Sequence, residues 1–338
     1  MRRPQIIKNI FLAGKMLLKG SIIFSITLIF LSPVFALEPL EKVDLKKLRD
    51  AIVFIFEAGS DPCTEANQAL PIGTGFMVSI STKADPSKAF KYVMTNAHIL
   101  RGRDKVVVRY NDTAGNRSIC QTYDVKAVGI FPTDSSVDLA AIAVGDVPNT
   151  FPVCFDHGFM LGTEQLKTAE IEEGTEVVAL GYLEPYAGYA KNFPVMRFGK
   201  LALLSEERWW RASEGPLQKG YVTEIYNMEG ASGSPVVLQP SQIRVNRNNV
   251  LENRRIDPFL IGVIKGYPNA YADIVDVDLE RGTKKRLKSF AVVSSGVAVM
   301  EPAQSVREFL ESLAKLLDSA GYPTVLTEPF KPELVPAK

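Results

Sequence analysis

Short runs of apolar and β-branched residues recur between residue 51 and about residue 300, and turn residues separate them. These runs are 51–56, 73–80, 91–96, 105–110, 123–131, 139–144, 175–182, 220–226, 234–238, 259–267, 289–295 and 296–300. The long helical patterns that a βαβ fold needs between its strands are missing from this region. The pattern therefore predicts an all-β architecture, either a sandwich or a barrel.

Helical periodicity is convincing only near the end of the chain. Its apolar residues are spaced as on one face of a helix, and they are Val306, Phe309, Leu310, Leu313, Leu316 and Leu317. Ser305 and Glu308 form a capping box, and Gly321 and Pro323 stop the helix. We expect a helix over 303–320 and a mobile, Pro-rich tail over 321–338.

Three other segments complete the pattern. The charged stretch 40–49 predicts a short helix before the first strand. We expect loops over 183–219 and over the polar stretch 239–258. The first of these loops holds Trp209-Trp210, a pair that suits either a contact surface or buried packing.

The first 36 residues have the pattern of a secretory signal. Five basic residues and no acid precede or flank an apolar run over 21–31, and Val34-Phe35-Ala36 follows it. This pattern predicts a signal peptide over 1–36, cleaved after Ala36, and an exported chain that is periplasmic or extracellular. An uncleaved membrane anchor is the alternative. No second stretch of spanning length follows, so we expect no stable membrane span after cleavage.

Composition and charge narrow the functional classes. The chain has 338 residues, 46% of them hydrophobic and 23% charged, which are ordinary globular fractions. Its net charge is +1, which gives no case for nucleic acid as a partner. With only two histidines a multi-histidine metal site is nearly excluded, and we expect no metal and no cofactor.

Of the exported cysteines Cys63, Cys120 and Cys154, one pair can form a disulfide, and the pairing stays open.

The hexapeptide 230–235 (Gly-Ala-Ser-Gly-Ser-Pro) carries the first chemical signal. Its glycines predict a tight turn that presents the hydroxyl of Ser232. The backbone amides of Gly230 and Ser232 would then form an oxyanion hole. A serine nucleophile needs an adjacent base. His98, at the end of a β run, suits this role better than His157, which lies in a turn-like sequence.

A third group must orient the imidazole. Asp138, directly before an apolar strand, is the best candidate, and Asp134 is a nearby alternative. The order His98, Asp138, Ser232 has separations of 40 and 94 residues. The chymotrypsin arrangement has the same order, with separations of about 45 and about 93 residues. Together the three residues are far more specific evidence for a serine nucleophile with its base and orienting acid than any one of them is alone.

At these residues the sequence resembles the trypsin-like (chymotrypsin-fold) serine peptidases, and within them the HtrA-like protease domains and the glutamyl endopeptidases. The resemblance rests on three motifs, Thr-Asn-Ala-His at 95–98, Asp-Leu-Ala-Ala-Ile at 138–142 and the hexapeptide at 230–235. It implies one peptidase domain over 37–318, built of two six-stranded antiparallel β-barrels, about 50–155 and about 170–300, with a C-terminal helix. The catalytic site would lie in the cleft between the barrels.

Departures from the family pattern qualify this resemblance. Ala231 stands where trypsin-type enzymes carry an aspartate that pairs with a freed N-terminus, so activation of that kind is not expected. We expect no PDZ module after residue 318, unlike in typical HtrA proteins. The family places the primary specificity pocket at residues that correspond here to Tyr226, Lys265, Gly266, Tyr267 and Gly296. A tyrosine floor argues against an Arg/Lys pocket.

The resulting prediction is an exported serine endopeptidase that acts on proteins or peptides through an acyl-enzyme. The alternative is a catalytically inert binding protein on a protease scaffold, since a fold does not fix a function. An esterase of the α/β-hydrolase type is excluded by the order of the residues, because that fold places the histidine last and no histidine follows Ser232.

Overall fold

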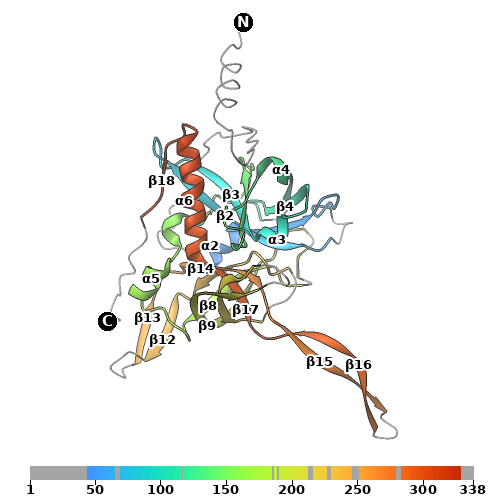
Figure 1. Cartoon of the computed structure of the whole chain (residues 1–338). Coiled ribbons are helices and arrows are strands. Elements are labelled where there is room, and N and C mark those ends of the chain that lie inside the picture. The colour runs from blue at the N-terminus through green and yellow to red at the C-terminus, as the bar shows by residue number, and fades with distance from the viewer. Residues whose placement is uncertain are drawn as a thin grey trace.

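The structure is a computed structural model of the whole chain (Figure 1). It describes residues 44–64, 69–115, 117–184, 186–188, 190–211, 216–226, 230–245, 251–278 and 283–328. The predicted signal peptide over 1–36 lies outside these ranges. Within them, no helix is long and apolar enough to cross a membrane.

The first half of the chain forms a curled antiparallel sheet. Its strands follow the order β5-β4-β1-β2-β3-β7-β6, and β18 pairs with the outer part of β2. The strands are β1 (Ile52–Glu57), β2 (Gly73–Thr82), β3 (Ala89–Thr95), β4 (Lys105–Asn111), β5 (Ser118–Asp124), β6 (Gly129–Ile130), β7 (Ala140–Val144) and β18 (Thr324–Val325). The central strands are buried almost throughout, which explains their continuous apolar runs.

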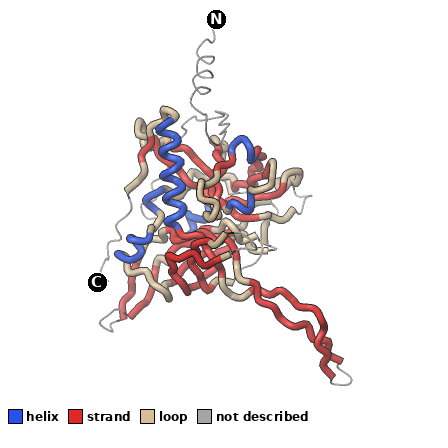
Figure 2. Tube along the Cα trace, viewed as in Figure 1, coloured by secondary structure: helices blue, strands red, loops and turns tan. Residues whose placement is uncertain are grey.

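The second half forms a closed six-stranded barrel of order β10-β17-β14-β11-β8-β9. Its strands are β8 (Glu176–Gly181), β9 (Val195–Trp210), β10 (Gln218–Glu224), β11 (Pro235–Leu238), β14 (Leu260–Gly266) and β17 (Ala298–Pro302). Two ribbons extend from it, β12 (Ser241–Val245) with β13 (Leu251–Arg255) and β15 (Asn269–Asp278) with β16 (Thr283–Ser294). The second ribbon projects far from the body of the protein (Figures 1 and 2).

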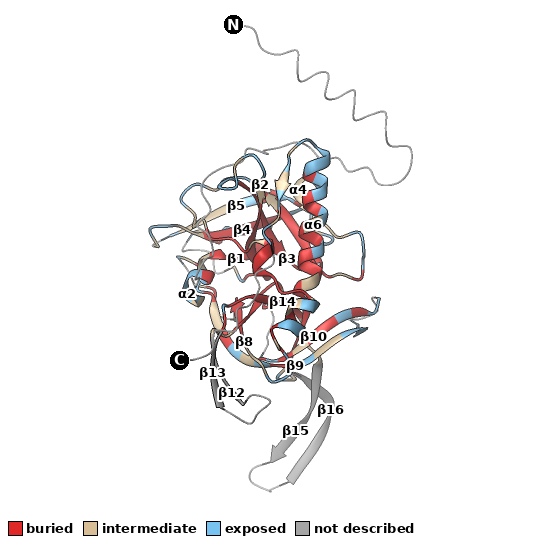
Figure 3. Ribbon diagram, turned by 90° about the vertical axis from the view of Figure 1, so that its left-hand side faces the viewer, coloured by how far each residue is buried: buried red, intermediate tan, exposed pale blue. Residues whose placement is uncertain are grey.

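In the part of the chain that the structure describes, helices are few and mostly short (Figure 2). They are α2 (Leu45–Leu48), η1 (Arg49–Ala51), α3 (Ala97–Leu100), α4 (Val125–Val128), η2 (His157–Phe159), α5 (Thr163–Thr168) and α6 (Ala303–Ser319). The long helix α6 follows the last barrel strand and packs its apolar face against β14, β17 and β18. Buried residues gather on the strands of both sheets and on one side of α6 (Figure 3).

The predicted fold class is confirmed: the chain is mostly β, with two antiparallel sheets and a C-terminal helix. The second sheet closes into a ring of hydrogen bonds, whereas the first stays open between β5 and β6. The open edge does not affect the placement of β3 and β7, which are neighbours in the sheet.

Several local expectations are wrong. The run 123–131 is not one strand, because the Asp124 carboxylate accepts hydrogen bonds from the amides of Lys126 and Ala127 and starts the one-turn helix α4. The expected loop 183–219 contains the long strand β9, in which polar and apolar residues do not alternate with burial: Phe198 and Leu203 are exposed, whereas Arg197 is buried. The expected loop 239–258 contains the ribbon β12–β13.

The C-terminal region also differs from expectation. Helix α6 begins after Pro302, and Ser305 lies inside its first turn, so the predicted capping box is wrong. The tail is not loose up to residue 328, because Thr324 and Val325 pair with β2. Cys63 and Cys120 form the disulfide, and Cys154 is a buried free thiol.

Candidate active site

His98 follows the central strand β3 of the first sheet. Thr95, the last residue of β3, pairs with Ala140 of β7, and Asn96 then begins the short helix α3 that carries His98. Strand and helix are otherwise buried, apart from the half-buried Lys91, whereas the His98 side chain is 45% exposed. The fold therefore holds the backbone of His98 rigidly and turns its imidazole toward solvent.

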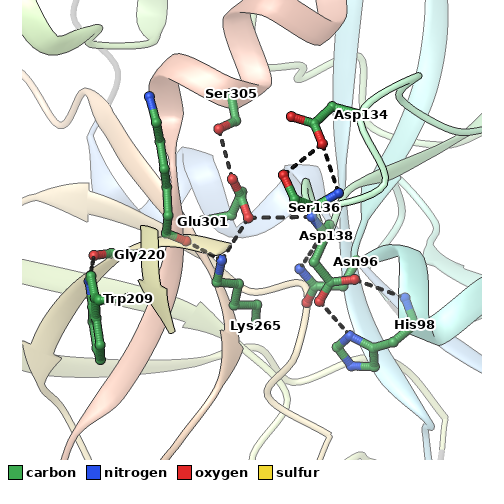
Figure 4. A network of polar contacts seen from close by, with 11 residues as sticks. Asn96, His98, Asp134, Ser136, Asp138, Trp209, Gly220, Lys265, Glu301 and Ser305 are labelled. Carbon is green, nitrogen blue, oxygen red and sulfur yellow. Dashed lines mark hydrogen bonds and ion pairs between the residues drawn. The ribbon is translucent and has the colours of Figure 1, made fainter. Parts of the chain in front are cut away.

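Asp138 contacts His98 twice (Figure 4). Its Oδ2 lies 2.7 Å from His98 Nδ1, and its Oδ1 accepts a hydrogen bond of 3.0 Å from the His98 backbone amide. The Asn96 side chain donates to the Asp138 carbonyl at 2.8 Å. These contacts fix the orientation of both the carboxylate and the imidazole.

The pKa of Asp138 reflects this environment. Burial alone raises it, but the hydrogen bonds from His98 and the charges of His98 and Lys265 outweigh burial, so the pKa lies below its ordinary value. Asp138 is therefore ionised near neutral pH. A carboxylate that accepts from Nδ1 keeps the proton of a neutral imidazole on that nitrogen and leaves Nε2 as the acceptor.

Asp134, the alternative acid, does not contact His98. Its carboxylate accepts from the hydroxyl and amide of Ser136 and pairs with Arg208. The bonds from Ser136 lower the Asp134 pKa most. Between the two candidate acids, the geometry selects Asp138.

The loop that carries Ser232 joins β10 to β11 and depends on two glycines. Gly230 has φ +78°, and a Cβ there would lie 2.2 Å from the Tyr182 ring. Gly233 has φ +88°, and a Cβ there would lie 1.8 Å from the Thr74 carbonyl oxygen. Both positions therefore require glycine, as the tight turn predicted from the sequence does.

Thr74 attaches this loop to the first sheet. Its amide donates to the Ser232 carbonyl at 2.8 Å, and its hydroxyl donates to the Gly230 carbonyl at 3.2 Å. The Thr95 hydroxyl donates in turn to the Thr74 carbonyl at 2.7 Å. The sequence alone did not point to Thr74; its only signal was its place in the run Gly-Thr-Gly-Phe at 73–76.

The structure thus brings His98 and Asp138 into direct contact and packs the Ser232 loop on the strand residues beside them. Thr95, which contacts Thr74, lies three residues before His98. The hydrogen bonds of the described residues do not include one between His98 and Ser232. Such bonds are often long in unliganded enzymes and tighten when substrate binds.

His157 contacts a different part of the protein. It is buried, its Nδ1 lies 3.0 Å from the Thr327 carbonyl oxygen, and its Nε2 lies 3.1 Å from a Glu311 carboxylate oxygen. These contacts join η2 to helix α6 and to the segment after β18. The second histidine therefore fastens the C-terminal region.

The residues expected around a specificity pocket differ in accessibility. Tyr226 is 60% exposed, Gly266 and Tyr267 are half-buried, and Gly296 is exposed with φ +80°. Lys265 is instead buried, and its ammonium pairs with Glu301 at 2.9 Å. The structure therefore does not present the Lys265 ammonium to a substrate.

Two further features bear on the site. Trp209 donates from Nε1 to the Gly220 carbonyl at 2.8 Å, and its ring packs edge-on against the Trp210 ring, with the centroids 6.0 Å apart. Among the residues that the structure describes, no group of three or more His, Cys, Asp or Glu side chains is arranged to hold a metal ion.

The solved structures to which the chain is similar are distant relatives. The MamO protease domain from Magnetospirillum magneticum is 16% identical, over 78% of this chain and 97% of that one, with a TM-score of 0.43. The Rv3671c protease, in an inactive form, is 17% identical, over 83% and 98%, with a TM-score of 0.42. The HtrA-type protease AlgW with a decapeptide is 14% identical, over 83% and 75%, with a TM-score of 0.42.

No curated protein matches the sequence. The sequence profile of the family described as the trypsin-like peptidase domain, in contrast, matches residues 73–243, half of the chain. This range begins at β2 and includes all three proposed catalytic residues. The chain belongs to the trypsin-like peptidase domain family and has a serine protease fold.

Proposed function

We propose that the chain is an exported serine endopeptidase in which Ser232 is the nucleophile, His98 the general base and Asp138 the residue that orients the imidazole. The observation that carries this proposal is the double contact between Asp138 and His98, at 2.7 Å to Nδ1 and 3.0 Å to the backbone amide. It holds the imidazole in the tautomer that can take a proton at Nε2.

The reaction follows from these roles. Ser232 Oγ attacks the carbonyl carbon of the peptide bond while His98 Nε2 takes its proton. His98 then gives this proton to the leaving amine, and the acyl-enzyme remains. Water, activated by the same nitrogen, releases the acid and restores Ser232. Asp138 stays ionised throughout and stabilises the imidazolium.

The negative charge of the tetrahedral intermediate needs hydrogen-bond donors. We assign this role to the amides of Gly230 and Ser232. The positive φ of Gly230 supports the assignment, because this conformation turns the peptide plane before the glycine in a way that other residues rarely adopt. The bonds from Thr74 hold the two carbonyls of the same loop, which makes the loop a pre-organised support.

Export is the second part of the proposal. It rests on the signal-like pattern of residues 1–36 and on the disulfide between Cys63 and Cys120. Disulfides persist in oxidising compartments such as the periplasm or the extracellular space.

The test is covalent labelling with a fluorophosphonate probe, which reacts with an activated serine hydroxyl. We expect the probe to label the wild-type chain at Ser232, as mapped by mass spectrometry of its peptides. Ser232→Ala should abolish labelling. Ser312→Ala, on the exposed side of α6, is the matched control and should label normally.

Two results would count against the proposal. Absence of labelling in a wild-type chain that melts cooperatively would favour the inert binding protein. Labelling that persists in Ser232→Ala would place the nucleophile elsewhere. A peptide-library cleavage assay with the same variants then defines which peptides the enzyme cuts.

A further inference from the structure

A buried ion pair lies next to Asp138, on the side away from His98 (Figure 4). Lys265 Nζ lies 2.9 Å from Glu301 Oε2, and the two side chains are 0% and 1% exposed. Lys265 also donates to the Lys219 carbonyl. Ser305, in the first turn of α6, donates to the other Glu301 oxygen at 2.7 Å.

A break in the strand pairing makes room for this lysine. The register between β14 and β17 shifts between Ile264 and Gly266, so Lys265 is the extra residue of a β-bulge. A bulge re-aims the side chain that it carries. Here the Lys265 ammonium is buried between the Lys219 carbonyl of β10 and the Glu301 carboxylate of β17, in a strand whose other residues up to Ile264 are apolar and buried.

The same Glu301 oxygen that binds Lys265 also contacts Asp138. It accepts a hydrogen bond of 3.4 Å from the Asp138 backbone amide. Asp138 therefore accepts from His98 on one side and donates to Glu301 on the other. The Lys265 charge also lowers the pKa of Asp138, by less than the contacts with His98 do, and both oppose the upward effect of burial.

Stability alone does not explain such a pair. Two apolar side chains of similar size often stabilise a protein as well as a buried ion pair does, because desolvation offsets the Coulomb attraction. A buried ion pair that contacts the backbone of Asp138 points to a role in the site.

We propose that Glu301 and Lys265 are positioning residues for the catalytic pair: Glu301 holds the Asp138 backbone, and the opposite charges of Glu301 and Lys265 balance each other beside Asp138, so that neither one acts unopposed on the pair. This inference rests on the proposed function. It also assigns Lys265 to the support of Asp138 rather than to recognition of an acidic substrate residue.

Opposite shifts of the His98 pKa are the signature of this role. Glu301→Gln leaves the Lys265 cation unbalanced, which repels the imidazolium, so the His98 pKa measured in this variant should lie below that of the wild type. Lys265→Met leaves the Glu301 anion unbalanced, so the measured pKa should lie above that of the wild type. The double variant should return the pKa to near its wild-type value.

NMR of the full chain measures this pKa without any enzyme activity. The chain has two histidines, His98 and His157, so the ring Cε1–H region of a pH titration holds two signals, and His157→Gln assigns them. Arg103, whose Nη1 lies 3.5 Å from the His98 carbonyl and which pairs with Glu57, is the same in every variant. Lys126→Met removes a surface cation from a 78% exposed pair and should leave the His98 pKa unchanged.

The hydrogen bond to Asp138 needs a separate comparison. Lys265→Met/Glu301→Gln keeps an oxygen that can accept from the Asp138 amide, whereas Lys265→Met/Glu301→Leu does not. We expect the leucine variant to label with fluorophosphonate at least tenfold more slowly than the glutamine variant. For a peptide substrate, kcat should fall and KM should stay the same.

Unchanged His98 pKa values in both single variants, or shifts of the same sign, would overturn the charge-balance role. Equal labelling rates in the two double variants would overturn the positioning role. If a single variant does not fold, the labelling rates of the two double variants still test the positioning role, because neither double variant carries the buried charges. Failure of wild-type labelling would refute the proposed function and leave the pKa result standing.

Discussion

Substitution of Asp138 by asparagine tests the core of the site with a change of one atom. The carboxylate accepts two hydrogen bonds, one from His98 Nδ1 and one from the His98 amide. An amide side chain has only one acceptor oxygen. If that oxygen stays on the His98 amide, the new NH2 group faces Nδ1 and forces the imidazole to carry its proton on Nε2. That tautomer cannot accept the proton of Ser232.

The magnitude follows from the two contacts. The bond from the ring nitrogen to a carboxylate contributes about 1.5–3 kcal/mol, and a buried donor left without an acceptor costs about 1–3 kcal/mol. Recovering the productive tautomer in Asp138→Asn therefore costs about 3–6 kcal/mol, which is a rate loss of about 10²- to 10⁴-fold. Substrate binding does not depend on this pair, so KM should change little.

The assay is the second-order rate of fluorophosphonate labelling at Ser232, followed by kcat/KM on a peptide from the library. Asp134→Asn is the matched control, because Asp134 contacts Ser136 and Arg208 and not His98; its rate should stay within about twofold of wild type, as for most surface changes. Circular dichroism checks that both variants are folded. An Asp138→Asn rate within tenfold of wild type would refute the reasoning.

Three further predictions concern the scaffold. Loss of the Cys63–Cys120 disulfide, whose cysteines are 57 residues apart, should lower the free energy of unfolding by about 4 kcal/mol in denaturant titrations of the doubly serine-substituted chain; a change below about 1 kcal/mol would contradict the loop-closure argument. Burial raises the pKa of the Cys154 thiol to about 12, so alkylation by iodoacetamide at pH 8 should require unfolding, and rapid labelling of the native chain would contradict this. Gly233→Ala should destabilise the chain by about 3 kcal/mol or more, because its Cβ would lie 1.8 Å from the Thr74 carbonyl oxygen; an unchanged melting temperature would show that the loop does not approach Thr74 so closely.

Local patterns in the sequence were sufficient for much of the fold. Strand residues that are buried on both faces form continuous apolar runs, so β1, β2 and β3 stand out along the chain. Helix α6 has a strong apolar face and a stop at Gly321, which has φ +87°. Each of these patterns lies in residues that are close together in the sequence, so it can be recognised without knowing which distant segments pack against it.

The candidate site was partly accessible in the same way. His98 and Asp138 each follow or precede a buried strand, and the pairing of β3 with β7 then places them side by side. The glycines around Ser232 indicated a strained turn, and Gly230 and Gly233 adopt positive φ. Spacing and residue type predicted this part because each motif lies at a strand end, where the scaffold fixes its position.

The tertiary structure alone decided the contacts between distant segments. The choice of Cys63 and Cys120 as disulfide partners, the pairing of Thr324 with β2 and the bulge that turns Lys265 toward Glu301 all depend on which strands become neighbours and in which register. A shift of one residue in register turns a side chain to the other face of a sheet. The linear sequence determined the strands and the chemical groups of this protein; the folded packing determined which buried charges support them.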